Sequence, residues 1–214
     1  MRLVLIAAKE LAFAKTRLGS RLAAGERALL AEAMFRDVLA AALSAQEADH
    51  VAVVTSDLLL LELARGAGAL VIDEEFPRGL NSAVRLATAA LIAEGAGTVV
   101  TVLSDVPLVT GEDIDIVIRA LPSAPGVVLV PSRDRTGTNM IARTPGDALA
   151  THFGSRSLAR HLEECRRLGL ACEVINLPRP AIDLDLVADL IEFMRVPSST
   201  HTFSQVARLG LAEG

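Results

Sequence analysis

The chain has 214 residues, of which 51% are hydrophobic and 22% are charged. This hydrophobic content excludes a disordered chain, and the length favours one domain over two. Lys and Arg number 21 and Asp and Glu 26, so the formal net charge is −5, and only 3% of the residues are aromatic. A nucleic-acid-binding protein would need a basic surface and stacking side chains, so we expect no nucleic-acid partner.

Short runs of Val, Ile and Leu alternate along the chain with segments of helical periodicity. Continuous apolar runs suit strands that are buried on both faces, as in a parallel sheet. Their alternation with helices predicts a layered α/β domain, Rossmann-like, with a mostly parallel sheet and flanking helices. In chain order, the expected elements are strand 3–6, helix 26–47, strand 51–54, helix 58–65, strand 70–72, helix 81–94, strand 99–103, helix 112–121, strand 127–130, helix 157–168, strand 173–175 and helix 186–194.

Three cations follow the first predicted strand: Lys9, Lys15 and Arg17. In sheets of this kind, ligands bind at the carboxyl ends of the strands. Local positive charge at that place would hold a polyphosphate and neutralise charge that develops on it. A solvated loop is the alternative interpretation. The segment matches neither a dinucleotide-binding nor a Walker sequence, so those two mechanisms are not supported.

Carboxylates follow the strand 99–103 and recur near the end of the chain. Asp105 is held beside a proline turn at a strand end, where it could ligate a divalent cation. Magnesium prefers one or two protein carboxylates together with phosphate oxygens and water. Asp183 and Asp185 stand two apart on an extended stretch, so they point the same way and could supply the second carboxylate. Asp185 could also cap the helix that follows.

Two further segments suit anion binding. Residues 131–139 are small and hydroxylic and follow a strand, and residues 153–157 open a helix. Backbone N–H groups at a helix start, together with the helix dipole, favour anions. Ser157 acting only as a helix cap is the alternative. Taken together, a cationic loop, two carboxylates and a second anion pocket suit metal-dependent transfer between two phosphorylated compounds.

Three other polar residues draw attention. Asn81 lies at a predicted helix start, where its amide could contact a base or ribose. His152 and His161 have no evident carboxylate or nucleophile partner. We therefore expect both histidines to be surface or packing residues.

The order of these motifs resembles the guanylyltransferases of deazaflavin coenzyme F-420 biosynthesis, from residue 1 to about residue 194. The resemblance implies a single-domain nucleotidyltransferase fold of the glycosyltransferase-A type. It also implies GTP as nucleotide, Mg²⁺ as cofactor and a small phosphorylated three-carbon acid as acceptor: phosphoenolpyruvate, 2-phospho-L-lactate or 3-phosphoglycerate. The motifs are Ala14-Lys15-Thr16-Arg17-Leu18, Met34-Phe35-Arg36-Asp37, Gly79-Leu80-Asn81, Ser104-Asp105-Val106-Pro107-Leu108, Thr136-Gly137-Thr138-Asn139, Phe153-Gly154-Ser155-Arg156-Ser157 and Asp183-Leu184-Asp185.

The resemblance also implies roles for single residues. Magnesium would be held by Asp105 with Asp185, and Asp183 is the second candidate for the latter place. The remaining residues would bind the two substrates. The phosphate or carboxylate of the acceptor would be bound by Thr138, Gly154 and Ser157. The phosphates of the nucleotide would be bound by the catalytic residues Lys9, Lys15 and Arg17, and its guanosine by Asn81.

One departure from the family pattern affects the acceptor. Arg135 stands where the family commonly has Gly, beside the predicted acceptor pocket, and would favour a different or more anionic acid.

Three alternative functions remain open at this point. The first is another nucleotidyltransferase of the same fold, of the molybdopterin or cytidylyl type. The others are a sugar transferase that uses residues 183–185 as its metal motif and a non-catalytic nucleotide-binding regulatory protein.

The remaining expectations concern location and assembly. Charged residues such as Glu32 and Glu62 interrupt the apolar stretches, so none reaches the roughly 18 apolar residues of a spanning helix. No signal-peptide cleavage pattern opens the chain, and we expect a cytoplasmic protein without membrane contact. The nucleotidyltransferase domain is expected to span residues 1–196 and a C-terminal tail residues 197–214. Apolar helix surfaces are compatible with a homodimer.

Overall fold

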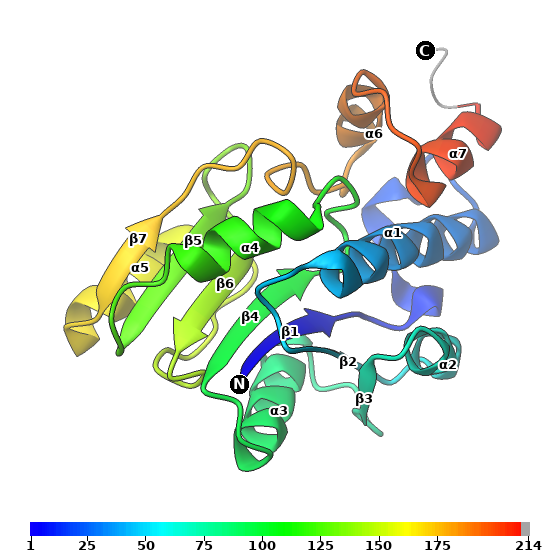
Figure 1. Ribbon diagram of the computed structural model, residues 1–214. Coiled ribbons are helices and arrows are strands. Elements are labelled where there is room, and N and C mark those ends of the chain that lie inside the picture. Colours follow the sequence, from blue (N-terminus) through cyan, green and yellow to red (C-terminus); the bar gives the residue numbers. More distant parts are fainter. Residues whose placement is uncertain (211–214) are drawn as a thin grey trace.

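One seven-stranded sheet forms the centre of the computed structural model, which describes residues 1–210. The strand order is β3-β2-β1-β4-β6-β5-β7. β6 runs antiparallel to β4 and β5, and the other neighbours are parallel, which confirms the predicted mixed, mostly parallel sheet (Figure 1). The strands are β1 (Arg2–Ala7), β2 (His50–Thr55), β3 (Leu70–Asp73), β4 (Thr98–Leu103), β5 (Gly126–Pro131), β6 (Thr138–Thr144) and β7 (Ala171–Val174).

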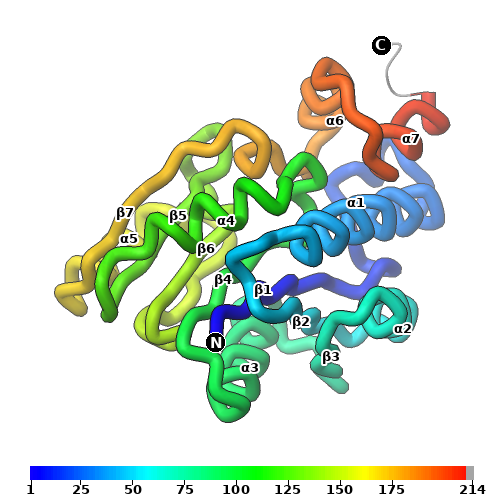
Figure 2. The backbone as a smooth tube through the Cα atoms, viewed as in Figure 1, coloured from blue at the N-terminus to red at the C-terminus, as the bar shows by residue number. Residues whose placement is uncertain are grey.

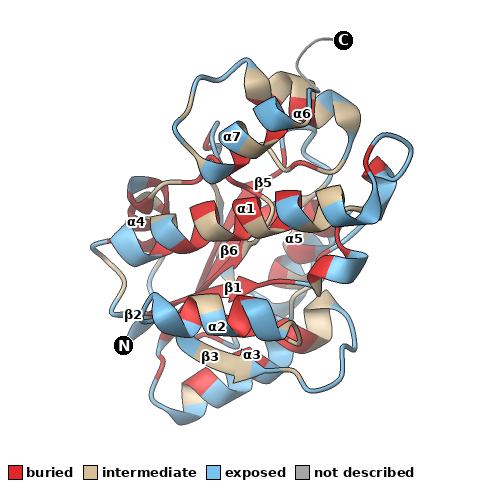
Figure 3. Ribbon diagram, turned by 90° about the vertical axis from the view of Figure 1, so that its right-hand side faces the viewer, coloured by how far each residue is buried: buried red, intermediate tan, exposed pale blue. Residues whose placement is uncertain are grey.

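Helices cover both faces of this sheet. Apolar side chains of α1, α2 and α4 form one core with the strands, and those of α3 and α5 form a second core on the other face. The central strands are buried while the helices expose one side (Figure 3), which explains why the strands are continuous apolar runs. Among the described residues, no helix is both long and apolar enough to cross a membrane. The helices are α1 (Ala24–Ser44), α2 (Leu58–Gly66), α3 (Leu80–Ala93), α4 (Gly111–Arg119), α5 (Ser157–Leu168), α6 (Val187–Met194) and α7 (His201–Arg208), with short 3-10 turns η1 (Leu11–Phe13) and η2 (Thr16–Leu18).

The sequence pattern does not predict β6, because this strand carries polar residues that normally indicate a loop. Two of them, Asn139 and Arg143, are 2% and 3% exposed. Each is hydrogen-bonded inside the protein: Asn139 donates to the carbonyl oxygen of Pro180 at 2.9 Å, and Arg143 donates to that of Leu149 at 2.9 Å. Buried polar groups are tolerated when they find such partners. The antiparallel strand thereby enters the middle of the sheet.

The predicted tail, residues 197–214, contains α7, which lies along α1 beside α6 (Figure 2). Asp37 of α1 caps the start of α7. Its carboxylate accepts hydrogen bonds from the backbone N–H groups of His201 and Thr202, both at 2.8 Å, and from the Thr202 hydroxyl at 2.6 Å. A carboxylate at a helix start satisfies free N–H groups and complements the helix dipole. Residues 211–214 lie outside the described residues.

Candidate active site

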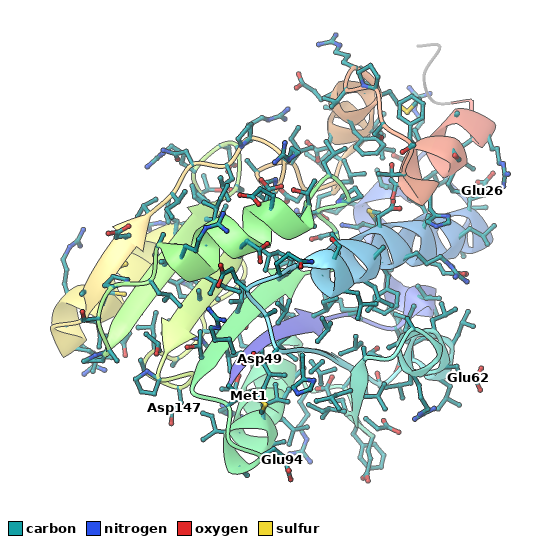
Figure 4. The ribbon with its side chains drawn as sticks, viewed as in Figure 1. Met1, Glu26, Asp49, Glu62, Glu94 and Asp147 are labelled. Carbon is teal, nitrogen blue, oxygen red and sulfur yellow. The ribbon has the colours of Figure 1, made fainter. Side chains whose placement is uncertain are left out.

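A cavity of about 860 Å³ opens at the carboxyl ends of β1, β4 and β5. Met1, Asp49 and Asp147 lie at the other end of the sheet, where β1 and β2 begin (Figure 4). The loops that follow these strands line the cavity, together with the segment before α5. It brings together every predicted site residue except Asn81: Lys9, Lys15, Arg17, Asp105, Thr138, Gly154, Ser157, Asp183 and Asp185.

Lys15 joins the two predicted carboxylate groups. Its Nζ lies 2.7 Å from Asp105 Oδ2 and 2.9 Å from Asp185 Oδ1, and its side chain is only 7% exposed. Arg17, on the exposed side, donates from Nη1 to Asp185 Oδ2 at 3.2 Å. Burial lowers the pKa of Lys15, but the two carboxylates outweigh burial and hold it above its usual value. Aspartates far apart in the chain therefore come together, and the cation between them is the ammonium of Lys15. That they hold a metal ion stays a prediction.

The late pair of aspartates occupies two different electrostatic environments. Burial raises the pKa of Asp185, but Lys15, Arg17 and Lys9 together hold it below its ordinary value. Burial and the nearby charge of Asp105 raise the pKa of Asp183. Asp185 is thus held in its charged form, whereas Asp183 lies where an added positive charge would be stabilising.

Asp105 provides the test of whether a divalent cation fits this site. Its Oδ1 atom is buried and has no hydrogen-bond partner among the described residues. An unsatisfied buried carboxylate oxygen is costly unless a cation or donor reaches it. Within residues 1–210, no group of three or more His, Cys, Asp or Glu side chains is arranged to hold a metal ion. Magnesium needs fewer, because phosphate oxygens and water complete its coordination.

The loop between β5 and β6 is organised by Asp134. Its carboxylate accepts hydrogen bonds from the Ser132 hydroxyl at 2.7 Å, the Thr136 backbone N–H at 2.9 Å and the Thr136 hydroxyl at 2.8 Å. These bonds, the one from Ser132 foremost, lower the pKa of Asp134. The next residue, Arg135, has a left-handed backbone (φ 59°), a conformation that favours Gly. Its guanidinium donates to Asn176 Oδ1 at 2.6 Å and does not line the cavity, so the structure does not support the more anionic acceptor expected from Arg135.

The three predicted acceptor residues surround the start of α5. Ser157 is the first residue of α5 and is 1% exposed, and its backbone N–H donates to the carbonyl oxygen of Gly154 at 3.1 Å. Arg156, with a left-handed backbone, is the capping residue, so the alternative role of Ser157 as a mere cap is wrong. The start of this helix faces the cavity beside Thr138. The N–H groups of Ser157 and Leu158 already donate to the carbonyl oxygens of Gly154 and Thr136, so it is the positive end of the helix dipole that would favour a phosphate or carboxylate here.

Two other sequence interpretations need correction. Asn81 donates from Nδ2 to the carbonyl oxygen of Phe153 at 3.0 Å and accepts the Phe153 backbone N–H at 2.8 Å, so both ends of its amide hold the loop before Gly154. Asn81 does not line the cavity. Asp185 does not cap α6 either. Leu186 is the capping residue, and its backbone N–H donates to Asp189 at 2.7 Å, whereas the Asp185 carboxylate contacts Lys15 and Arg17 in the site.

His161 is the residue that sequence reasoning misses. It is 0% exposed, and its Nδ1 lies 3.0 Å from the Thr138 hydroxyl oxygen. It is not a surface residue, and its contacts exceed simple packing. The one available signal is its spacing: His161 comes four residues after Ser157, which places both on one face of the helix.

The buried imidazole leads to a prediction about stability. Burial, then His152 and Arg143, lower the pKa of His161 to about 4. Between pH 6.5 and 4 the unfolded chain binds a proton here and the folded chain does not, so the free energy of unfolding falls as the pH falls, by about 3 kcal/mol from this group. Urea unfolding at pH 7 and pH 4.5 should show that the free energy of unfolding falls less between these pH values for His161→Gln than for the wild type. Equal losses for both proteins would contradict this assignment.

The family model described as "Guanylyl transferase CofC like" matches residues 1–212. The chain belongs to this family. It is therefore a nucleotidyltransferase enzyme, and the match extends past residue 194, where the resemblance in sequence motifs ends. Among its relatives, the phosphoenolpyruvate guanylyltransferase of Sphaerobacter thermophilus is 36% identical over 190 residues, 89% of this chain and 91% of the relative.

Other members of this guanylyltransferase family carry different acceptors in their names. The 3-phospho-D-glycerate guanylyltransferase of Phenylobacterium zucineum is 36% identical over 88% of both chains. The 2-phospho-L-lactate guanylyltransferase of Methanothermobacter thermautotrophicus is 32% identical over 92% of this chain and 85% of the relative. A crystal structure from Desulfovibrio desulfuricans, described as a nucleotide-diphospho-sugar transferase, has a TM-score of 0.79 at 18% identity and covers 99% of this chain and 97% of its own. That likeness shows the nucleotidyltransferase fold.

Proposed function

We propose that the protein transfers GMP from GTP to a phosphorylated three-carbon carboxylic acid and releases pyrophosphate, as a step of coenzyme F-420 biosynthesis. The relatives support the acceptor class, because the three acids in their names share a carboxylate and a phosphate on three carbons. The observation that carries the proposal is the cavity itself. It joins a buried cation between two carboxylates to a helix start whose dipole favours an anion, an arrangement that suits a reaction between two phosphorylated compounds.

The chemistry needs little covalent help from the protein. A phosphate oxygen of the acceptor attacks the α-phosphorus of GTP, the new P–O bond forms, and the bond between the α-phosphorus and its bridging oxygen breaks as pyrophosphate leaves. The attacking phosphate is already ionised, so no side chain has to remove a proton. Catalysis then rests on positioning and on stabilising charge. We assign the positioning of the acceptor to Thr138, Gly154 and Ser157, and the binding of the GTP phosphates to Lys9, Lys15 and Arg17.

Asp105, with Asp185 or Asp183, would hold Mg²⁺ in this proposal. The unpartnered Oδ1 atom of Asp105 supports this assignment. When bound, the ion would neutralise charge on the phosphate oxygens during transfer. The ammonium of Lys15 lies between Asp105 and Asp185. It would therefore contact the same phosphates as the ion.

A second, smaller cavity of about 140 Å³ adjoins the main one and suits the guanine base. The two cavities share Lys9 and Phe13, and two carboxylates, Glu10 and Glu74, line the smaller one. Each carboxylate has one oxygen engaged: Glu10 Oε1 accepts from the Ser56 hydroxyl at 2.9 Å, and Glu74 Oε1 accepts a backbone N–H. The second oxygen of either could accept the donors that guanine presents on its N1 and N2 atoms.

Substrate preference tests the base assignment. Inosine triphosphate lacks the 2-amino group of GTP, so the wild type should prefer GTP in kcat/KM by about tenfold or more, the worth of one hydrogen bond to a charged group. Glu10→Gln or Glu74→Gln should remove most of this preference, and the variant that keeps it serves as the control for the other. If the ratio of kcat/KM for GTP to kcat/KM for ITP is unchanged in both variants, the base binds elsewhere.

The proposed reaction is tested by incubating the protein with GTP, MgCl₂ and each of the three acids. We expect pyrophosphate release and a product whose mass is that of the acid plus GMP less water. Release with CTP in place of GTP would favour the cytidylyl alternative, and no release with any nucleotide and acid would overturn the proposal. Sedimentation velocity on the same sample tests the predicted homodimer.

A further inference from the structure

His161 makes a hydrogen bond through each of its ring nitrogens. Nε2 lies 2.8 Å from the backbone nitrogen of His152, and Nδ1 lies 3.0 Å from Thr138 Oγ1. The side chain is fully buried on the inner face of α5, one turn after Ser157. Phe153 packs against its ring edge-on, with centroids 5.6 Å apart. The imidazole therefore has one orientation and two fixed partners.

The partner on Nε2 decides where the proton of the ring lies. A backbone N–H can only donate, so Nε2 must accept and carries no proton. A neutral imidazole then has its proton on Nδ1, which must donate to Thr138 Oγ1. Burial together with His152 and Arg143 lowers the pKa of His161 to about 4, so this neutral form persists at neutral pH.

The Thr138 hydroxyl is directed by this bond. Its oxygen accepts from His161, so its own hydrogen is free, and Thr138 is 2% exposed and lines the cavity. No other acceptor for this hydrogen is found among the described residues. We propose that His161 is a positioning residue: it fixes the Thr138 hydroxyl as a hydrogen-bond donor aimed at an anionic oxygen of the acceptor. This inference rests on the proposed function, which assigns Thr138 to the acceptor.

The same imidazole also ties together the other parts of the acceptor site. His161 shares α5 with Ser157, and through Nε2 it holds His152, two residues before Gly154. Asn81 holds the intervening Phe153 from the other side through both of its amide atoms. The segment before Gly154 is therefore fixed at two successive residues. Thr138, Gly154 and Ser157 keep their relative positions because one buried ring contacts all three of the segments that carry them.

Two substitutions separate the two bonds of His161. His161→Gln can place an amide oxygen near the position of Nε2 and keep the bond to His152, but it loses the donor to Thr138. His161→Asn can place an amide nitrogen near the position of Nδ1 and keep that donor, but it loses the acceptor for His152. Thr138→Val removes the hydroxyl itself. Arg160→Ala, on the exposed side of the same helix, is the control.

We expect His161→Gln and Thr138→Val each to raise the KM for phosphoenolpyruvate, or for the acid the wild type uses, about tenfold with little change in the KM for GTP. The double variant should be no worse than Thr138→Val alone, because both changes remove the same hydrogen bond. His161→Asn should recover most of the loss. Multiplied effects in the double variant, or an equal rise in the KM for GTP, would overturn the proposal.

A spectroscopic measurement tests the geometry without turnover. In ¹⁵N-labelled protein at pH 7, long-range ¹H–¹⁵N correlations distinguish the two neutral forms of histidine, and the chain has only four histidines to assign. We expect His161 to carry its proton on Nδ1, and a proton on Nε2 would overturn the proposal. If the wild type shows this form but no acid supports pyrophosphate release, the proposed function fails while the geometry of His161 stands.

Discussion

Replacing Asp105 by Asn should lower turnover by about a thousandfold or more while leaving the fold intact. The substitution keeps the shape of the side chain but removes the negative charge that faces Lys15, and it replaces one carboxylate oxygen by an amide group that donates hydrogen bonds and cannot ligate a cation. Stabilisation of the reacting phosphates by a bound cation accounts for several kcal/mol, and each 1.4 kcal/mol is a factor of about ten in rate. Steady-state rates of pyrophosphate release at saturating GTP and MgCl₂ measure the effect.

Glu94→Gln is a matched control for this experiment. Glu94 lies at the end of α3, exposed and remote from the cavity (Figure 4), so the same loss of one carboxylate charge should leave turnover unchanged. Thermal unfolding followed by circular dichroism should give similar midpoints for all three proteins. Wild-type turnover in Asp105→Asn with magnesium present would contradict the proposal that Asp105 is a metal ligand.

Replacing Lys15 by Met should lower kcat by about a hundredfold to a thousandfold, the usual cost of removing one charge-stabilising group from an active site. Met keeps much of the apolar stem of Lys15 but removes the ammonium that lies between Asp105 and Asp185. The two carboxylates then repel each other and the phosphates lose a fixed positive charge. Single-turnover measurements with excess enzyme separate this loss from weaker binding of GTP.

Arg17→Met tests whether the loss of kcat in Lys15→Met depends on the buried position of Lys15. Arg17 also contacts Asp185, but its side chain is 71% exposed, so solvent screens its charge. We expect this variant to lose less than about tenfold in kcat. Equal losses in both variants would show that the total charge of the loop matters rather than the buried position of Lys15.

The architecture and the meeting of the site residues were predictable from the sequence for a physical reason. Strands buried on both faces must be apolar throughout, and residues directly after parallel strands gather at one edge of the sheet. Lys15 and Asp105 follow two such strands, so their convergence could be inferred without coordinates. β6 could not, because its polar residues are buried against partners distant in the sequence.

The roles of Asn81 and His161 were beyond the sequence for a related reason. Both side chains act on the backbone of the loop before Gly154, and a backbone group has no sequence signature. An Asn at a predicted helix start resembles a ligand-binding amide when its partners are unknown. Residues that bind substrate directly are recognisable by type and spacing, whereas residues that orient them are recognised only once the contacts are seen.

The pairing of Lys15 with Asp185 spans 170 positions of the chain. During synthesis, the first strands and Asp105 emerge long before Asp185 does, so a ribosome-bound chain of 180 residues has the loop that carries Lys15 but lacks Asp183 and Asp185. A polypeptide that ends before Asp183 thus lacks part of the candidate active site. Activity should appear only after residue 185 has been synthesised, and two fragments that separate Lys15 from Asp185 should restore it only when they associate.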